Sequence, residues 1–263
     1  MFLRIIVVLF ASVALVQAQT PSEKAWNILR GGAADKSSEK RAKAMNALGL
    51  LTHNTKARQM AENGLLDKEP EVRAAAASAL GQQGSTISIP KLKEAVKDAQ
   101  TEVVFAATNA LFLLKDPAAY EIYYAVLMGE KKSGEGLVES QMKMLKDSKA
   151  LAKLGFEAGI GFIPFGGVSY GVFKAVTRDD TSPVRAAAAQ KLVSDPDPKS
   201  GEALAKTAAD PKWLVRAAVA NAIAKRDDPA LLSAVTPLLD DDNDTVRNVA
   251  AAAVIRLSGK RKK

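Results

Sequence analysis

Short alanine-rich segments with one hydrophobic face recur along most of this chain, and polar turns separate them. In a clear example the apolar positions follow the spacing of a single helix face: Val72, Ala75, Ala76, Ala79 and Leu80. Alanine favours helices and has little affinity for strands, so this pattern predicts helices rather than a sheet. The small side chains also allow neighbouring helices to approach closely.

A second kind of amphipathic segment lies between the alanine-rich copies. Three examples are residues 89–96, 202–209 and 230–239, and Pro90 stands in the first turn of the first one. Each repeating unit is therefore expected to be a helix, a short turn and a second helix. Because one such pair cannot bury its apolar faces alone, the pairs must stack on one another.

The alanine-rich helices begin at an arginine that recurs with a nearly fixed period. Successive copies lie 32, 31 and 31 residues apart, measured from 41 to 73, from 185 to 216 and from 216 to 247. A sixth copy has Val104 where the arginine is expected. An aspartate precedes each of the six positions by six residues, and the recurring residues are Asp35, Arg41, Asp67, Arg73, Asp98, Asp179, Arg185, Asp210, Arg216, Asp241 and Arg247.

The Asp-x5-Arg turn, the Val-Arg-x-Ala-Ala helix start and the 31-residue period resemble HEAT repeats of the short bilin-lyase type. The resemblance covers residues 22–118 and 179–258. It implies that the recurring aspartates and arginines form a ladder that ties the turn of each unit to its neighbour, which is a stacking role rather than a binding role. At Val104 either the stack is apolar or the neighbouring unit differs. We predict an all-α fold, a right-handed α-solenoid of stacked HEAT-like helix pairs.

A non-repeating insertion at residues 119–178 interrupts the solenoid, which is expected to resume at the unit that begins with Asp179. Within it, residues 158–173 carry no charge, and a glycine-rich hydrophobic hairpin is expected over 155–173. A buried plug is the favoured interpretation, and docking of a partner or contact with a membrane are alternatives. The candidate contact residues are Phe162, Ile163, Pro164, Phe165, Tyr170 and Phe173.

The two ends of the chain have patterns of their own. Residues 1–18 resemble a secretory signal peptide, with a basic start, an apolar run and small residues before a cleavage site near Ala18. A retained membrane anchor is less favoured, because the apolar run is shorter than the roughly 20 residues that span a bilayer. We therefore expect an exported protein, periplasmic or extracellular, with N-terminal repeats at 19–118, C-terminal repeats at 179–258 and a basic tail at 259–263.

The composition of the chain argues against several kinds of functional site. The chain has no cysteine and a single histidine, His53, which we interpret as a solvated loop residue, so a typical zinc or iron site is not expected. The formal charge of +8 lies partly in the four basic residues of the tail, so a nucleic-acid partner is not expected either. No cofactor and no catalytic set is predicted.

The function predicted from these patterns is a non-enzymatic exported scaffold that binds a protein through its solenoid surface. The alternative is a membrane-associated envelope factor that uses residues 155–173 together with the basic tail. Membrane contact is the less favoured of the two.

Overall fold

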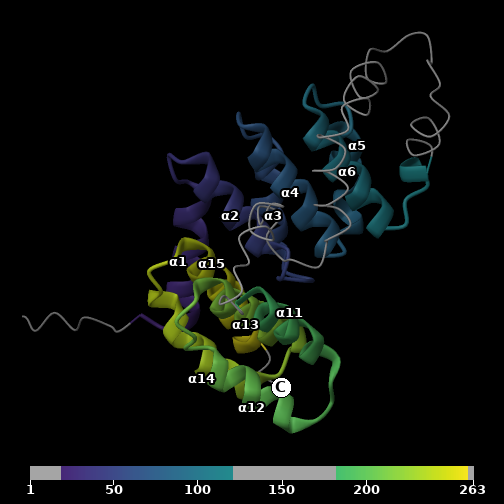
Figure 1. Ribbon diagram of the computed structural model, residues 1–263. Helices are drawn as coiled ribbons and strands as arrows, with labels where there is room; N and C mark the ends of the chain where they lie inside the picture. Colours follow the sequence, from purple (N-terminus) through teal and green to yellow (C-terminus); the bar gives the residue numbers. More distant parts are fainter. Residues whose placement is uncertain (1–18, 121–181, 260–263) are drawn as a thin grey trace, which may run out of the picture.

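The computed structural model describes residues 19–120 and 182–259, and every regular element in these two ranges is a helix. The predicted all-α solenoid is confirmed: helices pair off along the chain and the pairs stack (Figure 1). In each unit we call the helix before the aspartate turn the A helix and the helix after it the B helix.

The N-terminal array contains three helix pairs. Its elements are α1 (Pro21–Ala33), α2 (Ser38–Leu48), α3 (Thr55–Gly64), α4 (Pro70–Gln82), the 3-10 turn η1 (Thr86–Ser88), α5 (Ile89–Ala95) and α6 (Thr101–Leu113). Local sequence fixes several of the helix starts. Thr20 caps α1 in a capping box with Glu23, and prolines occupy the first turns of α1, α4 and α5.

The C-terminal array begins with a B helix. Its elements are α11 (Ser182–Lys191), η2 (Leu192–Ser194), α12 (Pro198–Thr207), α13 (Trp213–Arg226), η3 (Pro229–Leu231), α14 (Leu232–Val235), η4 (Thr236–Asp240) and α15 (Asp244–Ser258). The segment expected as one helix over 230–239 is divided into a short α-helix between two 3-10 turns. Pro237 lies in this segment, and a proline cannot donate a backbone hydrogen bond.

The core forms where B helices pack side by side. Within the N-terminal array α4 packs against α2 and α6, and within the C-terminal array α13 packs against α11 and α15. The contacts consist largely of alanines, and Leu48, Leu80 and Ile223 are among the larger fully buried side chains. Val104, where the arginine pattern fails, is itself buried in α6.

The two arrays meet at a joint that the order of the repeats does not predict. The last helix, α15, packs against α1 and α2 at the start of the chain, as the neighbouring α1 and α15 in Figure 1 show. Arg256 in α15 donates to the carbonyl of Leu50 at 2.7 Å, and Lys24 in α1 forms an ion pair with Asp240. In space, the B helices therefore follow the order α11, α13, α15, α2, α4, α6.

This spatial order defines the place of α11, the first described helix of the repeats after the insertion. The sequence predicts that the repeats resume there, but not which helices they stack against. In the structure α11 has α13 as its principal packing partner, while the N-terminal unit stacks on the opposite end of the C-terminal array. The two described helices that flank this part of the sequence, α6 and α11, therefore lie at opposite ends of the stack.

Candidate functional site

The recurring arginines and aspartates meet across the boundaries between units. Nε of Arg41 donates to Oδ2 of Asp67 at 2.7 Å, and its Nη2 donates to Oδ1 at 2.8 Å. Arg73 contacts Asp98 in the same bidentate way, with Nε 2.6 Å from Oδ2 and Nη2 2.9 Å from Oδ1.

The same contacts recur in the C-terminal array. Nε and Nη2 of Arg216 donate to the carboxylate of Asp241 at 2.6 and 2.8 Å, and Arg185 forms an ion pair with Asp210. We call these contacts the Arg–Asp ladder.

Three of the ladder arginines, Arg41, Arg73 and Arg216, also hold the turn of their own unit. Nη1 of Arg41 donates to the carbonyl of Asp35 at 2.9 Å, and Arg73 does the same to the carbonyl of Asp67 at 2.8 Å. The hydrogen bond from Arg41 lowers the pKa of Asp67. Burial works to raise the pKa of Asp98, but the hydrogen bonds from Arg73 and from the backbone of Gln100, together with the charge of Arg73, outweigh it and the pKa is lowered. Asp67 and Asp98 therefore join neighbouring units as ionised carboxylates.

The ladder changes at the joint. Arg247 pairs with Asp244 of its own helix, and Nη1 donates to the carbonyl of Asp241. Nζ of Lys40 lies 3.8 Å from a carboxylate oxygen of Asp35 and 3.9 Å from one of Asp244, so this lysine links the two arrays where Arg247 does not reach across the joint to Asp35.

Several predicted residues fall outside the described ranges. Asp179 is one of them, and the others are the candidate contacts of the insertion, Phe162, Ile163, Pro164, Phe165, Tyr170 and Phe173.

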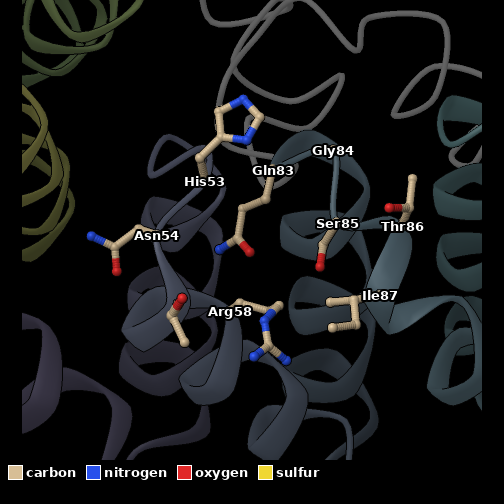
Figure 2. Close-up of a pocket in the computed structure, with 9 residues that line it drawn as sticks. His53, Asn54, Arg58, Gln83, Gly84, Ser85, Thr86 and Ile87 are labelled. Carbon is tan, nitrogen blue, oxygen red and sulfur yellow. The ribbon is translucent and has the colours of Figure 1, made fainter.

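A polar hollow of about 330 Å³ lies on the opposite side of the stack, where B helices end and the chain turns into the next A helix. We call this side the loop edge. The start of α3 forms one wall and the α4–α5 loop forms the other, as Figure 2 shows. Its lining contains no carboxylate and consists of His53, Asn54, Thr55, Arg58, Gln83, Gly84, Ser85, Thr86 and Ile87. We call it the His53 hollow.

The amide of Gln83 is fixed at the His53 hollow. Nε2 of Gln83 donates to the carbonyl of Leu48 at 2.8 Å, which settles which end of the amide is the oxygen. The residue is only 4% exposed, and its Oε1 is buried and has no hydrogen-bond partner in the structure. A buried acceptor without a partner costs free energy, so it indicates a site where a donor could bind.

Arg58 lines the His53 hollow, and the buried carboxylate of Glu62 holds its guanidinium in place. Nη1 of Arg58 lies 2.6 Å from Glu62, which also accepts from Ser88 and Lys91 at 2.7 Å each. Burial works to raise the pKa of Glu62, but the hydrogen bonds from Lys91, Ser88 and Arg58 lower it to about 2. Glu62 is thus an ionised anchor between the second and third units, and it orients Arg58.

His53 has an unusual backbone conformation and lies between two hollows. Its φ is +58°, in the left-handed region. A second hollow, of about 410 Å³, shares His53 and Asn54 with the first and extends across the joint to Asp227 and Arg256. The side chain is exposed, as expected for a loop histidine, but sequence reasoning missed its position between two hollows. The signal available was that the only histidine of the chain falls in a loop between repeat units.

Two further properties concern the described residues only. In residues 19–120 and 182–259, no group of three or more histidine, aspartate or glutamate side chains is placed to hold a metal ion. Over the same ranges, no helix is long and apolar enough to cross a membrane.

Comparison with known proteins agrees with the repeat pattern. A family model for HEAT repeats matches residues 14–122 and 171–255. A search among curated proteins returns no match. Among solved structures, human deoxyhypusine hydroxylase in complex with glycerol is 19% identical, with 90% of this chain and 85% of that chain covered and a TM-score of 0.33. The complex of CpcE and CpcF of phycocyanin lyase from Nostoc is also 19% identical, with 95% and 99% covered and a TM-score of 0.35. At these values the two likenesses define neither an activity nor a partner.

Proposed function

The chain belongs to the HEAT-repeat family, and from this premise we propose that it is a non-enzymatic scaffold that holds a protein partner on the surface of its stacked helices. The observation that supports this proposal most directly is the Arg–Asp ladder. The charges that recur from unit to unit are used to join the units, as Arg41 and Asp67 are. A repeat stack held in this way offers a long, stable surface, which is how solenoid proteins bind their partners.

We also propose that the scaffold is exported. The pattern of residues 1–18 supports this proposal, since it combines a basic start, an apolar run and small residues before Ala18. If the chain is exported, the partner that it binds must also lie outside the cytoplasm.

Affinity capture followed by reconstitution tests the scaffold proposal. The full chain, expressed in its native host with a C-terminal tag, is used to capture proteins from the envelope fraction, and each captured protein is purified and titrated against the purified chain. We expect at least one direct, saturable complex with one defined stoichiometry. The proposal is overturned if no captured protein binds the purified chain, or if the purified chain turns over a small molecule without a protein partner.

A further inference from the structure

We propose that the His53 hollow binds a carboxylate-bearing, extended peptide segment of the partner, with the carboxylate at the start of α3 and a peptide N–H donated to Oε1 of Gln83. This inference rests on the proposed scaffold function, because it specifies the chemistry of the partner. Three properties of the His53 hollow support it: a positive wall, an unsatisfied acceptor and an apolar rim.

The positive wall comes from α3 and Arg58. The helix has ten residues, and the N–H groups of its first turn, at Thr55 and Lys56, have no acceptor within the helix. Such amides, together with the helix dipole, favour a carboxylate or another anion. Arg58 uses Nη1 for Glu62, which leaves other N–H donors of its guanidinium for a ligand. With no carboxylate in the lining, this wall attracts negative charge.

The unsatisfied acceptor distinguishes a peptide from a simple anion. Oε1 of Gln83 cannot accept a hydrogen bond from acetate or chloride, since neither offers a donor at neutral pH. A peptide offers an N–H at every residue other than proline. Because Nε2 of Gln83 is already engaged by Leu48, the amide cannot reverse to present a donor without losing that hydrogen bond.

The rim and the neighbouring hollow suit an extended chain. Ile87 lies at the rim and is 70% exposed, so it offers an apolar contact to a side chain next to the carboxylate. The volume of about 330 Å³ is near the lower end of ligand pockets, which are typically about 300–1,000 Å³. The second hollow continues past His53 toward Arg256, which gives a longer segment a path along the loop edge.

The carboxylate has two possible sources, an acidic side chain or the C-terminus of the partner, and short peptides distinguish them. The probes are acetyl-AAEIA-amide, with a side-chain carboxylate, acetyl-AAQIA with a free C-terminus, and acetyl-AAQIA-amide, with no carboxylate. Sodium acetate supplies a carboxylate without a peptide N–H. Each is titrated into the full-length, 15N-labelled chain, and chemical shifts are followed by NMR.

We expect the carboxylate-bearing peptides to shift the backbone amides of Thr55 and Lys56 and the side-chain amide of Gln83. At least one of them should bind about tenfold more tightly than the neutral peptide and acetate. The peptide that binds more tightly identifies the source of the carboxylate. Equal binding of the neutral peptide, or shifts confined to other regions, would overturn the inference.

A matched pair of variants at the rim provides the second test. Thr86 is exposed and lines the His53 hollow, so Thr86→Glu adds a negative charge there, while Thr86→Gln adds the same bulk without charge. We expect Thr86→Glu to weaken binding of the carboxylate peptide by about five- to tenfold, because like charges a few ångströms apart repel. Thr86→Gln should bind within about twofold of the native chain.

The two proposals fail in different ways. If a purified partner binds the native chain and Thr86→Glu equally well and the peptides do not bind, the scaffold function stands and the His53 hollow is not its site. If no partner binds but the carboxylate peptides do, the hollow is a peptide site and the scaffold function is overturned.

Discussion

Arg41 and Asp67 lie in consecutive repeat units and join them through two parallel hydrogen bonds, of 2.7 Å from Nε and 2.8 Å from Nη2. A guanidinium and a carboxylate match each other in this geometry, which is stronger and more directional than a single contact between a lysine and a carboxylate. The same arginine holds the carbonyl of Asp35 in its own turn. One side chain therefore fixes both the turn that precedes it and the unit that follows it.

Removing the aspartate of one ladder pair should destabilise the stack. In Asp98→Ala, Arg73 keeps a largely buried guanidinium without its partner, and we expect a loss of about 2–3 kcal/mol in the free energy of unfolding. Urea titration followed by circular dichroism measures it. As a control, Glu94→Ala removes a carboxylate whose pairing with Lys97 is exposed, and little or no loss is expected. An equal loss in the two variants would contradict the assigned role of the ladder.

The stability of the chain should fall in acid, in part through Glu62. Its folded pKa of about 2 lies below the ordinary value of 4.5, so its contribution is complete above pH 4.5 and is lost as the pH falls toward 2. A shift of that size corresponds to about 3 kcal/mol at most. Urea titrations of the native chain and of Glu62→Gln, between pH 6 and pH 3, measure it.

We expect the difference in unfolding free energy between the native chain and Glu62→Gln to shrink as the pH falls. Glu94→Gln, on an exposed carboxylate, serves as the control and should show a small difference that barely changes with pH. A difference that stays constant for Glu62→Gln would show that its carboxylate is not held ionised by Arg58, Ser88 and Lys91.

The ends of two B helices should respond oppositely to substitution. Gly84 and Lys115 each lie 11 residues after the arginine position of their unit, and their φ angles are +69° and +59°. Glycine adopts this left-handed conformation without steric cost, whereas a side chain does not. We expect Lys115→Gly to stabilise the chain by about 0.5–1 kcal/mol and Gly84→Ala to destabilise it by about 1 kcal/mol, as measured by thermal and urea unfolding.

The same sign for both substitutions would contradict this interpretation. Lys115→Ala separates the backbone effect from the loss of the lysine charge. It should leave stability nearly unchanged, because alanine and lysine both carry the Cβ atom that makes this conformation unfavourable.

The sequence predicts the units well because their signals are local and periodic. The spacing of Arg73 and its equivalents identifies every B helix start in the described ranges, and the all-α solenoid is confirmed. The partner of each arginine is less obvious, since Arg73 is six residues from Asp67 but pairs with the carboxylate of Asp98 in the next unit and bonds only to the backbone carbonyl of Asp67. Periodicity shows that the charges recur, but not across which boundary they pair.

The candidate site was harder to predict for a physical reason. Its walls come from the loop around His53 and the loop after Gln83, which belong to different units and share no repeated motif. The unsatisfied Oε1 of Gln83 depends on a hydrogen bond to Leu48, 35 residues away. Such a feature depends on the way in which two units pack, and the residue types in each loop do not determine that packing.

The joint between the arrays is the feature that the sequence predicts least well, and substitutions at two adjacent glycines of α1 test it. A Cβ atom added at Gly32 would lie 3.0 Å from Cβ of Ala44 and 3.1 Å from Oδ1 of Asn248, whereas one at Gly31 would have no atom within 4 Å. We expect Gly32→Val to destabilise the chain by about 2–3 kcal/mol through overpacking, and Gly31→Val to be nearly neutral. Hydrogen exchange in the Gly32 variant should rise first in α1 and α15. If exchange rose equally in α4 and α13, or if both variants were neutral, α1 would not join the two arrays as described.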